Sequence, residues 1–301
     1  MEHSSTAPSG ARKRHLTFFA AWVLSLIALW GPLSALVTLS VDDYRYSHIV
    51  LIPFIGAGLI YLKRKHIFVG ERWFPRLGIP LLALGAALYV VGRSPLTSQG
   101  NSLSVFGLAI VVIWTAEFVW CYGPQASKAA LFPLLFLLLF VPIPSALLDV
   151  VIVGLQRGST EVTQWLYWVV GMPAFREGFQ FSLPGLTIEV AKECSSIRSG
   201  TALFITGLLA GYAFIRSPWR RACLVALTIP IAMFTDGVRI VILTWLTVHV
   251  DRGYLYGSLH HEGGAVFSLI SVVALMVAIV MLSEDKLRWR RGTRRLADPD
   301  R

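Results

Sequence analysis

The sequence predicts an all-α polytopic membrane protein with about eight transmembrane helices, a small outer-face hairpin and an interfacial helix. Hydrophobic residues make up 55% of the chain and charged residues only 15%, which is outside the usual range for a soluble globular protein. Apolar runs of about 20 residues, enough to cross a bilayer, recur along the chain. The net charge of +10 comes from short basic clusters between these runs, which orient a membrane protein, so nucleic-acid binding is not expected.

Four spans are expected before residue 123. The first, at about 16–39, follows the basic run Arg12–His15 and is too long for the apolar core of a signal peptide, so residues 1–15 form a cytoplasmic tail. The second, at about 49–62, follows an outer loop and ends in the basic run Lys63–His66. The third and fourth, at about 77–91 and 103–122, are joined by a polar outer loop.

A fifth span begins near Ala129 and ends or kinks at Pro142 and Pro144, since proline removes a backbone donor and restricts the residue before it. Residues 145–193 then form an outer-face insertion. Its second half shows the turn signals and alternation of a hairpin, over 179–183 and 186–190. Its first half is expected to be a helix lying along the interface, because apolar residues alternate with Gln156, Arg157, Thr160, Glu161, Thr163 and Gln164.

Three more spans complete a single domain over 1–301: about 197–215, a seventh from about 222 through Pro230, and about 264–282. The apolar run Ile240–Val248 is too short to cross. It is therefore interfacial, re-entrant or an extension of the seventh span. The basic tail 284–301 is cytoplasmic by its charge, so both termini lie inside.

Cys194 stands where a short alternating polar segment meets an apolar helix. A thiol acts as a nucleophile only as thiolate, which a helix N-terminus and basic neighbours such as Lys192 and Arg198 favour. The alternative is a buried structural cysteine. The other two cysteines, Cys121 and Cys223, form no CxxC pattern, so neither a metal site nor a disulfide framework is expected, and no cofactor is predicted.

Two further ionisable residues fall on the same outer face as Cys194 when the spans are counted. Arg239 would lie against the positive-inside rule, which favours a functional role. His260, with His261 as the alternative, has an imidazole suited to proton transfer. Cysteine, arginine and histidine together suit acyl transfer. Asp236 orients a partner or, as we favour, caps a helix.

Taken together, these motifs resemble the exosortase/archaeosortase family. The resemblance rests on residues 193–198 around Cys194, on residues 237–240 around Arg239, and on His260 with Gly264 and Phe267. It extends to Tyr46-Ser47-His48, to Pro142-Ile143-Pro144 and to the segment from Gly178 to Gly185, so that it covers most of the chain.

The resemblance implies a cysteine transpeptidase or thiol protease, multi-pass in the cell inner membrane, with its active site on the periplasmic face. Its partners would be membrane lipid and exported proteins that carry a C-terminal sorting signal of recognition motif, transmembrane segment and basic tail. Cys194 would form the acyl-enzyme, Arg239 would serve as acid or oxyanion donor, and His260 would assist. The alternative from another class is a transporter or structural membrane protein in which Arg239 and His260 line a substrate path.

The expected topology can be tested by labelling single cysteines, placed at Ser258 and at Ser283 in a cysteine-free background. An impermeant thiol reagent added from outside should modify position 258 and spare position 283, because six basic residues between 286 and 295 follow the last span. The reverse pattern would place about 30 Å of hydrocarbon between His260 and Cys194 and exclude a shared active site.

Overall fold

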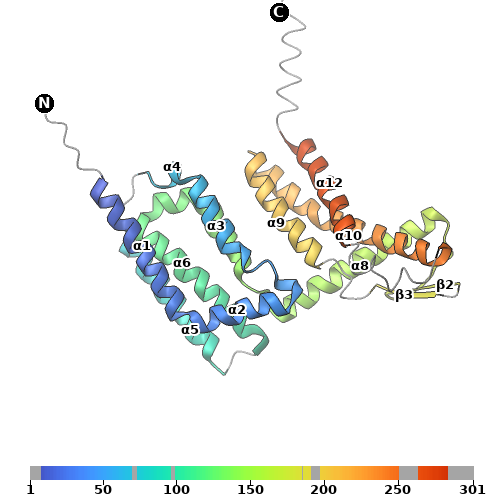
Figure 1. Cartoon of the computed structure of the whole chain (residues 1–301), viewed down its shortest axis with the longest axis horizontal. Helices are drawn as coiled ribbons and strands as arrows, with labels where there is room; N and C mark the ends of the chain where they lie inside the picture. Colours follow the sequence, from blue (N-terminus) through green and yellow to red (C-terminus); the bar gives the residue numbers. More distant parts are fainter. Residues whose placement is uncertain are drawn as a thin grey trace, which may run out of the picture. The chain divides into compact units, whose positions relative to one another are not determined.

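The computed structural model describes residues 8–69, 73–95, 99–184, 186–190, 197–250 and 264–283. These residues are mostly helical, and their contacts divide the chain into two compact units, Met1–Leu148 and Asp149–Arg301. Figure 1 shows the elements of each unit along the chain. The assignment of the whole chain to a single domain stays a prediction.

The first unit begins with two helices where one straight span was expected. Helix α1 covers Pro8–Ala28 and α2 covers Trp30–Asp42, and the two are bent by 75° at Leu29. Pro32, in the first turn of α2, has no N–H to donate to the preceding turn, which explains the break. A short 3-10 turn, η1 (Tyr44–Tyr46), leads to α3 (Leu51–Leu62) and α4 (Arg64–Ile67).

Asp43 and Arg45 form an ion pair in the connection between α2 and α3, with 2.6 Å between Arg45 Nη2 and Asp43 Oδ2. The hydrogen bond from the Arg45 side chain holds the pKa of Asp43 below its ordinary value. The Asp43 carboxylate also accepts from the Arg45 backbone N–H at 3.0 Å and so initiates the 3-10 turn.

A glycine seam joins α5 (Pro75–Arg93) to α6 (Gln99–Ala129). Gly78, Gly85 and Gly92 are seven residues apart and all buried on α5. A Cβ added at each would lie 2.6, 2.5 and 2.8 Å from side-chain atoms of α6. The residues that it would meet are also seven apart, namely Trp120, Ile113 and Phe106. Small residues at this spacing let two membrane helices approach closely.

The remaining helices of the first unit confirm the break expected at the paired prolines. Helix α6 bends at Gly123, whose φ of 78° is in the left-handed region. Helix α7 (Leu131–Phe136) continues into the 3-10 turn η2 (Leu137–Phe140), and the chain is then non-helical up to Pro144.

The second unit contains the predicted hairpin and one strand that the sequence analysis missed. After α8 (Ser145–Val170), strands β1 (Phe175–Glu177), β2 (Gln180–Leu183) and β3 (Leu186–Glu189) form an antiparallel sheet in the order β1-β2-β3. Gly171 and Gly178 adopt φ of 73° and 61°, so their turns need residues that tolerate a left-handed backbone.

Three helices, α9 (Ile197–Phe214), α10 (Pro218–His249) and α12 (Gly264–Leu282), lie side by side in the second unit (Figure 1). Their shared core is formed by Leu203, Ile215, Leu224, Ala232 and Leu275. Helix α10 is continuous over 32 residues, so the run Ile240–Val248 is an extension of the seventh span, one of the three expected alternatives.

The number of membrane spans is only partly settled. Four helices of the described residues are long and apolar enough to cross a membrane, or up to six if each of two bent helix pairs is one span. Two shorter apolar helices lie within α9 and α12. The protein is thus a multi-pass helical membrane protein, while the number of eight spans is not confirmed.

The glycine seam generates a prediction for stability. Gly78→Ala would place its methyl group 2.6 Å from Trp120 Cβ and 3.0 Å from Trp120 Cα, so the two helices must separate. We expect a loss of about 1–3 kcal/mol, read as a lower thermal unfolding temperature in detergent. Gly58→Ala in α3, where a Cβ meets nothing within 4 Å, is the matched control and should be neutral or stabilising. Equal effects of the two changes would contradict the seam.

Candidate active site

Of the three predicted catalytic residues, Arg239 is the one that the described structure places. It is half-buried on α10, ten residues before the helix ends at His249. Cys194 and His260 lie outside the described residues. Asp236, which we expected to cap a helix, lies inside continuous α10 and is buried, so that expectation is wrong. The apolar run after it extends the same helix instead of starting a new one.

The segment that carries Cys194 is positioned at both ends. Before it, Val190 is fully buried, and its N–H donates to Phe179 O at 2.9 Å. The Val190 carbonyl accepts from Gln156 Nε2 on α8 at 2.6 Å. After it, α9 begins at Ile197, close to where the sequence predicts the sixth span to begin. The structure therefore places both residues that flank the Cys194 segment, Val190 and Ile197.

Helix α8 buries part of the polar side that we expected to face water. Gln156, Thr160 and Thr163 are at most 2% exposed, whereas Arg157, Glu161 and Gln164 are exposed, as an interfacial helix would require. Thr160 and Thr163 donate to the carbonyls of Gln156 and Ser159, at 2.7 Å each. A hydroxyl that bonds to its own helix in this way can be buried at little cost.

Helices α8 and α10 meet along this buried polar side. A Cβ on Gly237 would lie 2.7 Å from Val162 Cγ1, so glycine is needed for the approach. Thr244 lies about one and a half turns beyond Arg239 on α10. Its hydroxyl is hydrogen-bonded to the hydroxyl of Tyr167 on α8, at 2.6 Å. Since Thr244 donates its proton to Ile240 O, the Tyr167 hydroxyl is the donor to Thr244. We call Gln156, Ser159, Thr160, Thr163, Tyr167, Gly237 and Thr244 the polar seam.

A hydrophobic core and the side chain of Arg176 attach the sheet to helices α8 and α10. The core joins Tyr167 and Ile240 to the sheet residues Phe181 and Leu183 and to Val190. Arg176 of β1 donates to Gln164 Oε1 at 2.6 Å, to Glu161 Oε1 at 2.9 Å and to Gly178 O at 3.0 Å. The exposed polar residues of α8 therefore hold the sheet in place.

A pocket of about 370 Å³ lies in the first unit, and a smaller one of about 260 Å³ lies at the end of α10 in the second unit. The smaller pocket is the relevant one here because it lies between the sheet, the end of α8 and the end of α10. His249 stacks on Trp245 in its wall, with ring centroids 4.8 Å apart. Ten residues of helix separate His249 from Arg239, which is about 15 Å. The other lining residues are Val170, Gly171, Met172, Pro173, Leu183, Pro184 and Val248.

The sequence analysis missed Gln156, Tyr167 and Thr244 as positioning residues. Their signal was present on α8, where positions 156, 159, 160, 163 and 167 repeat at helical spacing and are all polar or aromatic. No group of three or more histidine, cysteine or acidic residues that could hold a metal occurs in the part of the chain that the structure describes.

Helices long enough to cross a bilayer, together with a small sheet that leads into the segment carrying Cys194, define a multi-pass membrane protein. Comparison with family models shows the family. The model described as transmembrane exosortase (Exosortase_EpsH) matches residues 38–277. The chain belongs to the transmembrane exosortase family. No curated protein and no solved structure matched the chain.

The bond from Gln156 to Val190 generates a second prediction. Gln156→Met keeps the length of the side chain but leaves the buried Val190 carbonyl without this donor, which costs about 1–3 kcal/mol. We expect a lower thermal unfolding temperature and faster hydrogen exchange at residues 186–190. Arg157→Met, at the neighbouring exposed position of the same helix, is the control and should cost less than about 0.5 kcal/mol. Equal losses would show that the bond does not hold this segment.

Proposed function

We propose that the protein is a cysteine transpeptidase that cleaves the C-terminal sorting signals of exported proteins at the periplasmic face of the cell inner membrane. The family match carries this proposal, because residues 38–277 include Cys194, Arg239 and His260. The positioned ends of the Cys194 segment support it, since a nucleophile has to be held against its substrate.

The proposed reaction proceeds through a thioester. The Cys194 thiolate attacks the scissile carbonyl, and Arg239 donates hydrogen bonds to the oxyanion that forms. The peptide C–N bond then breaks, and His260 gives the leaving amine its proton. An acceptor nucleophile, or water, attacks the thioester and releases the thiolate. Arginine suits the oxyanion role because it stays charged and presents several N–H groups in a fixed fork.

The pocket at the end of α10 is our candidate for the recognition motif of the sorting signal. Its walls combine apolar side chains with the ring of His249 and with backbone of the turn at Gly171 to Pro173. Such a mixture accepts one apolar or ring-bearing side chain and leaves hydrogen-bonding groups for the substrate backbone. The transmembrane segment of the substrate would lie in the bilayer beside the helices, with its basic tail in the cytoplasm.

The hydrogen bonds of the buried threonines on α8 and α10 argue against the transporter alternative. A substrate path along Arg239 would need polar groups free to exchange partners. Instead, the buried threonines of α8 and α10 donate to carbonyls of their own helices, at 2.7 to 2.9 Å.

The proposal is tested first at the nucleophile. Cys194→Ala should abolish conversion of a tagged substrate with a C-terminal sorting signal, and the wild type should accumulate a hydroxylamine-sensitive adduct on Cys194. Cys121→Ala and Cys223→Ala are the controls. Cys121 is buried and Cys223 half-buried, and neither is in the proposed site. Full conversion by Cys194→Ala would overturn the mechanism.

The second test concerns Arg239. Arg239→Lys keeps the charge but loses the planar fork, so we expect the rate of thioester formation to fall by about 10²–10³ if Arg239 donates to the oxyanion. Arg157→Lys, at an exposed position of α8, controls for the exchange itself. A near-normal rate in Arg239→Lys would indicate that only charge is needed at this position.

A further inference from the structure

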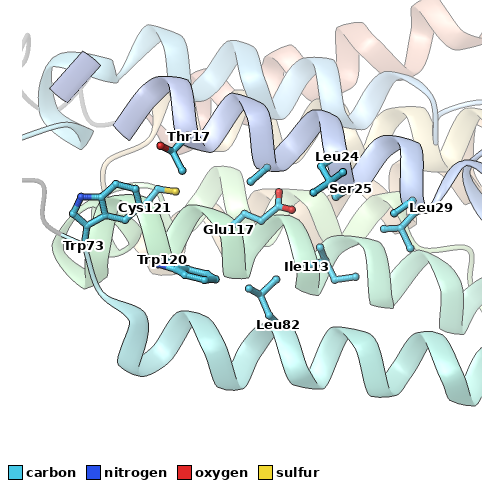
Figure 2. A pocket seen from close by; sticks show the side chains of 12 residues that line it. Thr17, Leu24, Ser25, Leu29, Trp73, Leu82, Ile113, Glu117, Trp120 and Cys121 are labelled. Carbon is cyan, nitrogen blue, oxygen red and sulfur yellow. The ribbon is translucent and has the colours of Figure 1, made fainter. Parts of the chain in front are cut away.

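A cavity in the first unit has no part in the proposed reaction. It has a volume of about 370 Å³ and lies between α1, the segment before α5, and α6. Helices α1 and α5 both pack against α6, which forms the floor (Figure 2). The apolar wall is formed by Ala21, Leu24, Ala28, Leu29, Leu82 and Ile113, and one end is closed by Thr17, Trp73, Trp120 and Cys121.

One acid points into this apolar cavity. Glu117 of α6 is 7% exposed and lines the cavity, and Figure 2 shows its carboxyl group directed toward α1. Its Oε2 atom is buried and has no hydrogen-bond partner among the described residues. The neighbouring hydroxyl of Ser25, which bonds to Trp22 O at 2.8 Å, also lies within hydrogen-bonding reach of the Glu117 carboxyl group, but Oε2 is left without a partner. A buried acid in this state lacks a donor that a ligand can supply.

The surroundings define what that ligand must be. Leu24 and Trp73 at the edge of the cavity are 67% and 44% exposed, and α5, α6 and the α1–α2 pair are candidate membrane spans. The cavity therefore opens toward acyl chains, and its occupant arrives from the bilayer. Apolar walls of this extent do not retain water. A ligand with many polar groups would leave them unpaired, and an anion would be repelled by the acid.

We propose that this cavity binds a single-chain amphiphile from the bilayer, whose ammonium or hydroxyl head donates a hydrogen bond to Glu117 Oε2. The alkyl chain lies along the leucine and isoleucine side chains of α1, α5 and α6. The volume is in the range of sites for small molecules. An ammonium head would also pair with the carboxylate, and a hydroxyl head would give a neutral hydrogen bond.

The test uses the full chain in lipid nanodiscs and three photoreactive probes with the same sixteen-carbon tail: an amine, an alcohol and a carboxylic acid. After irradiation, labelled peptides are identified by mass spectrometry. We expect saturable labelling of peptides from α1, α5 and α6 by the amine, the alcohol or both, and at least about tenfold weaker labelling by the acid. Which donor labels the cavity identifies the head group.

Two variants separate the proposal from non-specific labelling. Glu117→Leu should weaken the labelling by the donor probes at least about tenfold. Ala21→Phe fills the cavity without touching the acid and should block the same labelling, which keeps the test valid if Glu117→Leu does not fold. Glu117→Gln should weaken the amine far more than the alcohol, because it removes the charge and retains an acceptor.

Glu161→Gln is the control, since Glu161 is an exposed acid of α8 paired with Arg176, and it should leave the labelling unchanged. The proposal is overturned if no probe labels these helices saturably, if the acid labels as well as the donors, or if labelling persists in folded Glu117→Leu and Ala21→Phe. The readout is binding, so these results do not depend on peptide cleavage.

Discussion

In hydrocarbon, every backbone N–H and C=O must find its partner within the protein, and this constraint determines where irregular structure and polar chemistry can occur in the chain. The described sheet and its turns occupy 171–190, between two helices, and the Cys194 segment follows directly. At the junction, the carbonyl of Val190 would be buried without a partner if Gln156 did not reach it from α8. That one side chain allows an extended strand to approach the helices of the second unit just before the segment that carries Cys194.

Much of the fold follows from local signals in the sequence. The prolines at 142 and 144 end a helix because proline cannot donate to the preceding turn, and the alternation over 179–190 gives a hairpin because strand side chains alternate between faces. The bend at Leu29 was not predicted, although Pro32 carries its signal, because hydropathy averaged over a window does not register one missing N–H. The glycine seam between α5 and α6 was missed for a similar reason, since its meaning depends on the residues opposite.

The candidate site was predictable in its residue types and only partly in its surroundings. Arg239 could be singled out because its predicted place on the outer face runs against the positive-inside rule. Asp236 was misjudged because a short apolar run after it resembled a new helix, whereas α10 passes through this point without interruption. The buried side of α8 was also misjudged. Polar residues at helical spacing predict a solvent-exposed face only if their side chains cannot form hydrogen bonds inside the protein. Gln156, Thr160 and Thr163 form such bonds inside the protein.

The ability of a side chain to form hydrogen bonds within its own helix also distinguishes the buried threonines of α8 and α10 from the buried Glu117 of α6. A threonine hydroxyl in a helix can donate to the carbonyl four residues earlier in the same helix. Thr235, Thr244 and Thr247 do so on α10. A glutamate has no proton to give when ionised, and its longer side chain carries the carboxyl group away from its own backbone toward the neighbouring helix. The threonine hydroxyls of the polar seam are therefore satisfied within their own helices, whereas Gln156 Oε1 and Ser159 Oγ of the same seam have no partner among the described residues. Glu117 Oε2 also lacks a partner and, in addition, Glu117 lines a cavity, which is why we propose a ligand with a donor group there.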